Sequence, residues 1–371
     1  MNSSPRFTVI LAGYQTAPYL PESLSSVSGQ TFKDFEAICY VEESTDDSLE
    51  ICEEHARKDP RFKVATGPKS GGVGSTRNYG IDHASGEYLV VLDGDDRLSR
   101  RLLEKLALKL QEIGEADVVA FSAVTVPDGE TDPEKLTLLT NFRKEDASGV
   151  FSGREALLRA GRHGGQFRAY TWLCAYRTQF LRENRFYQTV GLCMEDFEWA
   201  PRVWFAAEKF AYLDEIAYVY RRRGGSLTTE SSSRLVLDLA KQLCSLLEFA
   251  SEKDIPENLK RIWSNQWLSV LYWFLFHPIS SGKISDGDRK KALETLFAPP
   301  CGEKLRALAA FASGPKRAPL PLLLLGAKGL VFPARLYFQF LYYPLNDMRQ
   351  GKKRTKTGEA GEEKSSLHLP E

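Results

Sequence analysis

The sequence predicts an α/β protein in which a mostly parallel sheet is flanked by helices, followed by a C-terminal helical extension. Two observations carry this prediction. Between Phe7 and Leu92, apolar runs rich in β-branched and aromatic residues alternate with helical patterns, which is the order of a parallel-sheet domain. After about Ser231 the character changes to long helical patterns. A chain of 371 residues can hold one large domain and a smaller one.

Four apolar runs are the expected strands of the first part of the chain. They are Phe7–Ala12, Phe35–Val41, Phe62–Ala65 and Tyr88–Leu92. We expect a helix in each gap between them. The first begins near Pro21 and closes at Ser28-Gly29. The second is capped by Asp46 or Asp47, and the third is capped by Ser75 or Thr76 and ends near Ser85-Gly86.

The segment from Leu98 to Gly225 is less regular. We expect a helix over Leu98–Ile113, a strand over Val118–Val126 and a loop over the site at Pro127–Asp146. The spacing Ser152-x-x-Glu155 is a capping box that opens a short helix ending near Gly161. The remaining expectations are a helix in the second half of Arg168–Asn184, a helix from Met194 through Ala207, strands over Phe210–Leu213 and Ala217–Tyr220, and a basic turn at Arg221–Gly225.

Composition and charge exclude several classes of protein. The net charge is zero and the hydrophobic content is 43%. The protein therefore has no overall basic field that would indicate nucleic-acid binding. Six scattered cysteines without a CxxC pair are typical of reduced cytosolic thiols rather than of a disulfide framework or a zinc site. The five histidines show no metal-ligand spacing. The N-terminus has no basic segment followed by an apolar one, so we expect no signal peptide.

The stretch Gly86–Asp96, GEYLVVLDGDD, is the strongest local signal for a functional site. A strand buried on both faces is expected to end in the carboxylates Asp93, Asp95 and Asp96. Ligands of open α/β sheets bind outside this carboxyl edge. Oxygen ligands suit Mg²⁺ or Mn²⁺, which commonly accompany a phosphate-bearing substrate. The alternative is a simple turn, since Asp and Gly are turn formers.

Four pieces of sequence, in the right order, together resemble the family 2 glycosyltransferases of the GT-A fold, especially bacterial enzymes of surface-polysaccharide synthesis. The first runs from Thr8 to Glu36. The second contains Arg77-Asn78-Tyr79-Gly80 and Leu92-Asp93-Gly94-Asp95-Asp96. The third contains Trp172, Tyr176-Arg177 and Glu195-Asp196, and the fourth runs from Tyr212 to Thr228. They cover roughly residues 7–98 and 168–229, and the C-terminal part lies outside the resemblance.

The resemblance implies an inverting, metal-dependent transfer of a sugar from a nucleotide-sugar donor to a hydroxyl of a glycan or lipid-linked acceptor. It implies a GT-A (Rossmann-like) catalytic domain over residues 1–230. The nucleotide-sugar-binding half would span about 1–98 and the acceptor half about 99–230. We expect a helical region over 231–346 and a disordered tail over 347–371.

The donor and its metal are assigned by matching positions. Asp93 and Asp95 resemble the family's DxD pair, with Asp95 on the metal and Asp93 on the metal or the donor. Asp96 is expected to cap the helix beginning near Leu98. Ala12 and Tyr14 would line the nucleobase pocket. Arg221 and Arg223 match the place where the family brings a basic residue to the diphosphate.

One departure from the family pattern concerns the nucleotide. The usual Val-Asp-Asp-Gly-Ser-Thr-Asp is replaced by Tyr40-Val41-Glu42-Glu43-Ser44-Thr45-Asp46. The family uses an acidic residue here to hold the nucleobase and ribose, and Glu42 keeps the carboxylate with one more methylene. Either the base sits differently or a neighbour takes over, so the sequence does not identify the nucleotide.

Three further side chains carry two readings each. Asp196 resembles the general base, with Glu195 a weaker catalytic candidate, and capping of the following helix is the alternative. Arg77 could reach the donor's phosphates or form a structural salt bridge. Trp172 could offer an aromatic platform to the acceptor sugar or pack in the core.

The C-terminal region raises the question of a membrane. Leu320–Leu345 is strongly apolar but interrupted by Pro321 and Pro333, and Lys352, Lys353, Arg354 and Lys356 follow it. Either this stretch packs on the core, or residues 320–356 lie on a membrane surface. The expected location is cytoplasmic, with peripheral contact at the inner face of the membrane under the second reading.

Two other functions remain open. A nucleotidyltransferase would need a basic glycine loop near the N-terminus, and Leu11-Ala12-Gly13-Tyr14-Gln15 does not supply one. A catalytically degenerate glycosyltransferase kept as a binding subunit is favoured only by Val41 and Glu42, whereas Asp93, Asp95 and Asp196 argue against it.

Overall fold

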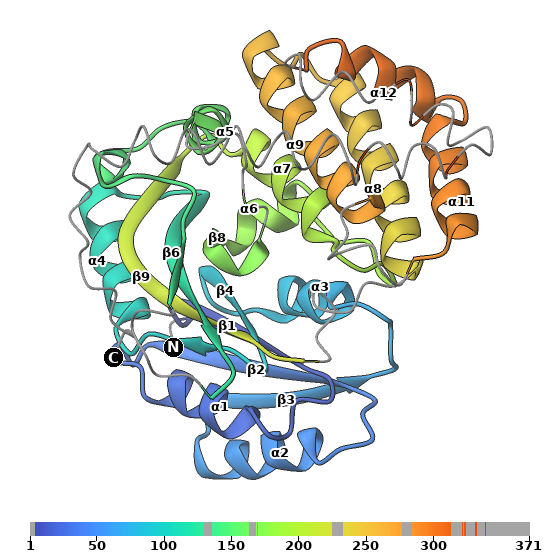
Figure 1. Cartoon of the computed structure of the whole chain (residues 1–371). Coiled ribbons are helices and arrows are strands. Elements are labelled where there is room, and N and C mark those ends of the chain that lie inside the picture. Colours follow the sequence, from blue (N-terminus) through green and yellow to red (C-terminus); the bar gives the residue numbers. More distant parts are fainter. Residues whose placement is uncertain are drawn as a thin grey trace. The chain divides into compact units, whose positions relative to one another are not determined.

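The computed structural model describes residues 4–129, 136–162, 168, 170–224, 233–276 and 284–312, together with Pro321, Leu323, Val331 and Phe338. These residues fall into two compact units, one that ends at Arg223 and one that begins at Gly224 (Figure 1). The expected tail over 347–371 and nearly all of the apolar stretch 320–345 lie outside the described residues.

The first unit is built on a single mixed sheet, which has nine strands within the described residues. Its order is β3-β2-β1-β4-β8-β6-β9-β5, and β7 pairs with β6. The strands are β1 (Phe7–Gly13), β2 (Phe35–Glu42), β3 (Phe62–Gly67), β4 (Tyr88–Asp93), β5 (Arg97–Leu98), β6 (Val118–Pro127), β7 (Thr137–Leu139), β8 (Cys174–Arg177) and β9 (Phe210–Arg222). This confirms the predicted α/β class.

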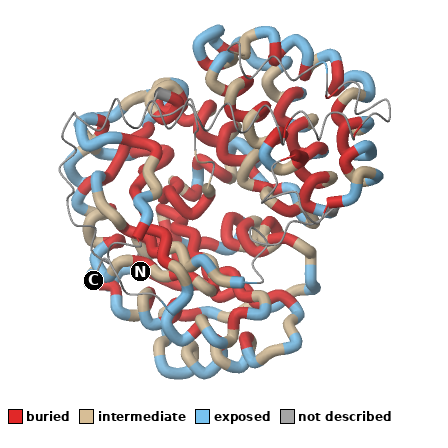
Figure 2. The backbone as a smooth tube through the Cα atoms, in the orientation of Figure 1, coloured by how far each residue is buried: buried red, intermediate tan, exposed pale blue. Residues whose placement is uncertain are grey.

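The parallel half of the sheet follows the expected alternation. Strands β3, β2, β1 and β4 are mutually parallel, and every residue of β1 and β2 is buried. The intervening helices are α1 (Leu20–Ser28), α2 (Ser48–Lys58) and α3 (Gly74–His83). Figure 1 shows α1 and α2 on one face of this half and α3 on the other, and Figure 2 shows the strands between them as buried. Continuous apolar runs are required because both faces are covered.

The second half of the sheet differs from the expectations in several places. The short strand β8 lies antiparallel between β4 and β6, in a segment where only the helix α6 (Thr178–Glu183) was expected. The two expected strands at 210–220 are one strand, β9, which follows β6 in parallel through a shift of register. Four-residue β8 and two-residue β5 are too short to produce an alternating pattern.

The helices of this half are α4 (Leu102–Ile113), α5 (Gly153–Arg162) and α7 (Asp196–Ala206). Ser152 Oγ accepts the Glu155 amide at 3.2 Å, as the capping box predicts. Two other predicted caps are wrong. The helix α3 begins at Gly74 without a side-chain cap, and α4 begins after Arg101 rather than beside Asp96. The expected loop over 127–146 includes β7 and a short 3-10 helix, and its residues 130–135 lie outside the described set.

The second unit is helical. It contains α8 (Ser233–Glu252), α9 (Glu257–Phe276), α11 (Asp286–Phe297) and α12 (Cys301–Ala309). Their helical structure agrees with the long helical patterns predicted after about Ser231. Trp263 and Trp267 of α9 stack with ring centroids 5.3 Å apart. No helix among the described residues combines the length and the apolarity that crossing a membrane requires.

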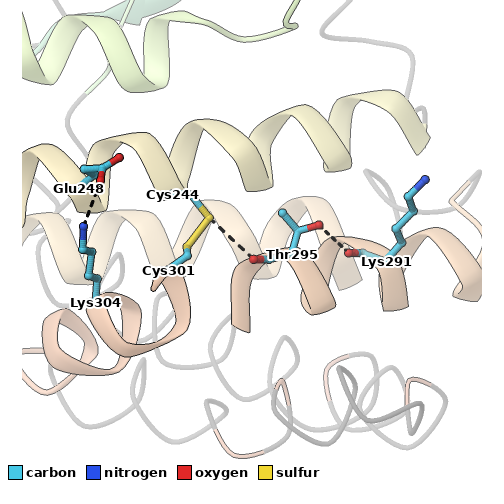
Figure 3. The surroundings of a disulfide bond; sticks show 6 residues. All are labelled: Cys244, Glu248, Lys291, Thr295, Cys301 and Lys304. Atoms are coloured by element: carbon cyan, nitrogen blue, oxygen red, sulfur yellow. Dashed lines mark hydrogen bonds and ion pairs between the residues drawn. A yellow bond between two sulfur atoms is a disulfide. The ribbon is translucent and has the colours of Figure 1, made fainter. Parts of the chain in front are cut away.

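A disulfide joins Cys244 of α8 to Cys301 of α12, with Cα atoms 5.3 Å apart (Figure 3). The expectation that the cysteines are all reduced is therefore wrong for this pair. Positions 57 residues apart gave no sequence signal for pairing. Cys39, Cys52, Cys174 and Cys193 are free and buried.

Candidate active site

The candidate site lies at the carboxyl edge of the parallel strands. Ala12 of β1 stands beside Asp93 of β4 in the sheet register, and Gly13 stands beside Val41 of β2. The predicted nucleotide residues Ala12 and Tyr14 therefore lie next to the predicted donor carboxylate. Tyr14 is half-buried, and the ammonium of Lys69 lies 4.6 Å from the centre of its ring.

Asp95 is held by the arginines at the end of β9. Its Oδ2 accepts Arg223 Nε at 2.6 Å, and its backbone carbonyl accepts Arg221 Nε at 3.0 Å. Arg221 also forms ion pairs with Glu22 and Asp128. Both guanidinium groups lie 5.2 Å from the centre of the Tyr19 ring. The structure thus brings the predicted metal carboxylate and the two predicted diphosphate arginines together.

Asp96 has a structural role that the sequence did not suggest. Its side chain is buried and accepts the Tyr218 hydroxyl and the Arg221 amide, each at 2.7 Å. Burial, followed by the charges of Asp95 and Asp93, raises the pKa of Asp96 well above its ordinary value. Asp96 therefore ties the end of β4 to β9 and sets where Arg221 and Arg223 emerge.

Arg77 of α3 lies at the centre of a buried network of three carboxylates. Its side chain is 4% exposed. Nη1 lies 2.5 Å from Glu195 Oε1 and 2.7 Å from Asp196 Oδ1, and Nη2 lies 3.4 Å from Asp93 Oδ1. Burial lowers the pKa of this guanidinium, but the charges of Asp196, Asp93 and Glu195 raise it above its ordinary value. The geometry favours the salt-bridge reading of Arg77 over an open contact with the donor's phosphates.

The carboxylates around Arg77 are themselves perturbed. Burial raises the pKa of Asp93 to about 6, against the opposing charge of Arg77. Burial likewise raises the pKa of Glu195 to about 7, again opposed by Arg77. Carboxylates whose pKa values are raised by burial beside a charged partner are typical of functional sites.

Asp196 is the first residue of α7, and its carboxylate does not cap that helix. Glu195, at the N-cap, makes no side-chain capping bond. Oδ1 of Asp196 accepts both Arg77 and the Thr171 hydroxyl. Among the described residues Oδ2 has no hydrogen-bond partner, and the side chain is 13% exposed. This arrangement supports the base reading, because one oxygen is fixed and the other is available to a hydroxyl.

Two residues of this network carried no sequence signal. Gln188 donates from Nε2 to Thr171 Oγ1 at 3.0 Å, and Thr171 donates in turn to Asp196. A lone Thr and a lone Gln are ordinary surface or core residues in a sequence. Their role follows only from the fold, which brings the 3-10 helix at Thr171–Leu173 next to the start of α7.

Trp172 is not an exposed platform. It is 4% exposed and stacks against Tyr170, Tyr218 and Tyr220 with centroid distances of 4.8, 4.4 and 5.4 Å. This burial favours the packing reading of Trp172, and direct contact with the acceptor stays a prediction. Tyr170 and Tyr220 are the half-buried members of this stack.

Glu42 is buried and bonded within the protein. Oε1 accepts the hydroxyls of Ser70 and Ser75, both at 2.5 Å, and Oε2 accepts the Ser70 amide at 3.1 Å. The predicted contact of this carboxylate with a nucleobase or ribose is thus not favoured by the geometry. Ser70 and Ser75 thus satisfy a carboxylate that is one methylene longer than the family aspartate.

Among the described residues, a divalent metal fits a pair of carboxylates that is completed by the donor's phosphates. The described residues contain no group of three or more His, Cys, Asp or Glu side chains placed to hold a metal. Mg²⁺ at phosphate-transfer sites is commonly bound by one or two carboxylates together with substrate phosphates. Asp93 and Asp95 supply such a pair, and both are partly exposed.

Comparison with known proteins identifies the domain that carries this site. Residues 8–181 match the family model described as Glycosyl transferase family 2. These residues form a family 2 glycosyltransferase domain. Asp93 and Asp95 lie within it, and Asp196, Arg221 and Arg223 lie beyond its last matched residue.

Several relatives of the glycosyltransferase domain are bacterial. The chain is 30% identical over 227 residues to the uncharacterized glycosyltransferase EpsJ of Bacillus subtilis, which covers 60% of this chain and 63% of EpsJ. It is 27% identical over 230 residues to the glycosyltransferase GlyG of Streptococcus pneumoniae, with 60% and 73% covered. The minor teichoic acid biosynthesis protein GgaB of Bacillus subtilis is 32% identical over 164 residues, with 38% and 18% covered.

A solved structure shares the fold. TarS 1–349 of S. aureus, in complex with UDP-GlcNAc, superposes with a TM-score of 0.68 at 20% identity, covering 93% of this chain and 92% of TarS 1–349. The predicted GT-A fold with C-terminal helices is thereby confirmed.

Proposed function

We propose that this chain is an inverting, metal-dependent glycosyltransferase of bacterial cell-surface polysaccharide synthesis. It would move one sugar from a nucleotide-sugar donor to a hydroxyl of a glycan or lipid-linked acceptor. One observation carries the proposal. At one edge of the sheet, a donor-side carboxylate pair with two arginines stands next to Asp196, which Arg77 and Thr171 orient.

The donor side would neutralise the departing diphosphate. Arg221 and Arg223 lie at the end of β9 with their guanidinium groups beside Asp95, where they can bind phosphate oxygens. Asp95 and Asp93 would hold Mg²⁺ or Mn²⁺. When bound, that ion supplies positive charge to the diphosphate leaving group.

Asp196 would act as the general base. The acceptor oxygen forms a bond to the anomeric carbon while its proton passes to Asp196 and the bond from that carbon to the diphosphate breaks. The nucleoside diphosphate leaves with the electron pair. Arg77 and Thr171 hold the base by Oδ1. A single displacement with inversion uses this one base and needs no second carboxylate as nucleophile.

The test begins with the nucleotide, because Glu42 leaves it open. Thermal shifts with UDP, GDP, CDP and TDP, each with Mn²⁺, would identify the base, since a ligand that binds only the folded protein raises its melting temperature. Hydrolysis or transfer from the matching nucleotide sugars is then measured. Asp196→Asn should lower turnover by about 10²- to 10⁴-fold and keep the thermal shift.

A matched control is Asp34→Asn, an exposed aspartate at the opposite end of β2. It should leave both measurements unchanged. Absence of hydrolysis and transfer with every donor, with no further loss in Asp196→Asn, would favour the degenerate binding subunit instead.

The predicted membrane contact through residues 320–356 stays a prediction, as does cytoplasmic location at the inner face of the membrane.

A further inference from the structure

The departure from the family at Glu42 leads to an unexpected contact between the two halves of the catalytic unit. Glu42 ends β2, and its carboxylate accepts three hydrogen bonds from Ser70 and Ser75. Ser70 lies in the segment 68–73, which we call the glycine loop, and Ser75 lies in the first turn of α3. Glu42 therefore ties the glycine loop and the first turn of α3 to the end of β2.

The glycine loop packs closely on the segment 187–194, which we call the base loop because it leads directly to Glu195 and Asp196. A Cβ atom at Gly72 would lie 2.2 Å from the carbonyl oxygen of Leu192, so only glycine permits this approach. A Cβ atom at Gly74 would lie 3.0 Å from the Thr189 carbonyl oxygen. The two segments come from different halves of the chain and touch backbone to backbone.

A reciprocal pair of hydrogen bonds joins the same elements. Asn78 Nδ2 of α3 donates to the Gln188 carbonyl at 2.8 Å, and the Gln188 amide donates to Asn78 Oδ1 at 2.7 Å. The Gln188 side chain continues to Thr171, the partner of Asp196. The contacts thus run without a gap from Glu42, through the glycine loop and α3, to the base.

The base loop also contacts α3 and the glycine loop through side chains, since the Tyr187 hydroxyl donates to Asp82 at 2.6 Å and Cys193 Sγ donates to the Gly71 carbonyl at 3.8 Å. It contains no regular secondary structure, Val190 is exposed, and Met194 has a positive φ of 60° just before the catalytic pair. A non-glycine residue in this conformation persists where its surroundings fix it. The glycine loop and Asn78 are the surroundings that the contacts identify.

We propose that Glu42 is a positioning residue that holds the glycine loop against the base loop and thereby fixes Asp196, in place of a role in reading the nucleobase. The catalytic meaning of this coupling rests on the proposed function, whereas the coupling itself does not. It explains why a glutamate occurs where the family has an aspartate, since the longer side chain reaches Ser70 and Ser75.

Two backbone amides report on the coupling without any ligand. Ser70 N donates to Glu42, and Gln188 N donates to Asn78. Hydrogen–deuterium exchange would be measured on the full chain and on Glu42→Gln. A glutamine side chain offers one acceptor oxygen in place of two. Both amides should exchange about tenfold faster, as expected for the loss of a charged hydrogen bond.

The matched control is Glu36→Gln. Glu36 is a buried carboxylate at the other end of the same strand, bonded to Thr8, Lys63 and the Ser85 amide. It should leave exchange at Gln188 unchanged. Asn78→Ala is the second variant, and it should accelerate exchange at Gln188 but not at Ser70.

Each outcome decides the proposal. Faster exchange at Ser70 without a change at Gln188 in Glu42→Gln overturns it, as does acceleration at Gln188 in Glu36→Gln. Where wild-type turnover is measurable, Glu42→Gln should lower kcat about tenfold with KM for the donor within about threefold of its wild-type value. A raised KM with unchanged kcat would instead make Glu42 a donor-binding residue. If the wild-type chain shows no turnover but Glu42→Gln still accelerates exchange at Ser70 and Gln188, only the proposed function is refuted.

Discussion

Replacement of Arg77 by methionine would remove the guanidinium group that lies among three carboxylates. Asp93, Glu195 and Asp196 all lie within 3.4 Å of its guanidinium, and the Arg77 side chain is almost fully buried. Methionine fills a similar volume, so the change removes charge more than packing. Loss of one partner of a buried ion pair typically costs about 3–5 kcal/mol in the free energy of unfolding.

The loss should depend on pH in a defined direction. Asp93 and Glu195 have folded-state pKa values of about 6 and about 7, both above their ordinary values of 3.8 and 4.5. A carboxyl group with a raised pKa contributes stability that is full below its unfolded pKa and is lost as pH rises through the folded pKa. At pH 8 both groups are charged and need Arg77, whereas at pH 5.5 they are largely neutral.

The assay is urea unfolding of wild type and Arg77→Met at pH 8 and pH 5.5, followed by tryptophan fluorescence. We expect a loss of about 3–5 kcal/mol at pH 8 and less than half of that at pH 5.5. Arg61→Met is the control, because the Arg61–Asp59 pair is partly exposed and should cost at most about 1 kcal/mol. A loss at pH 8 no larger than that of the control, or an equal loss at both pH values, would refute the reasoning.

Two other predictions concern stability, one from a buried ring and one from the disulfide. Trp172→Ala should lower the free energy of unfolding by about 3–5 kcal/mol, because its ring is buried in the tyrosine stack. A raised acceptor KM at unchanged stability would instead restore the platform reading. Reduction of the Cys244–Cys301 disulfide, which closes a loop of 57 residues, should destabilise the unit that begins at Gly224 by about 2–4 kcal/mol. Equal urea midpoints of the wild type with and without reductant would contradict this prediction. So would an equal loss of stability when reductant is added to Cys244→Ala, which has no disulfide to reduce.

The sequence predicted the parallel half of the fold well because its signals are local. The runs at Phe7–Gly13 and Tyr88–Asp93 are buried on both faces and therefore apolar throughout. Strand β8 was missed because it has four residues and its place between β4 and β6 depends on partners about 60 to 90 residues away in the chain.

The site was predicted by residue type but not by partner. Asp95 and Arg223 were both singled out, and the structure adds that they bind each other. For Asp96 and Glu42, the surroundings favour a role other than the one expected from the sequence, and for Trp172 they favour one of the two readings. Each of these side chains is buried by elements that join the site from distant parts of the chain, and burial of this kind leaves no local pattern.

The ion pairs of the site join residues that are far apart in the chain, and this has a consequence for folding during translation. Arg77 is separated from Glu195 by 118 residues and Asp95 from Arg223 by 128. A chain leaving the ribosome has its first four strands long before these partners exist, since domains emerge from the N-terminus at about 5–20 residues per second. During that interval Arg77 and the carboxyl edge of β4 must stay hydrated. The parallel half of the sheet therefore cannot reach its final packing until the end of β9 has been made.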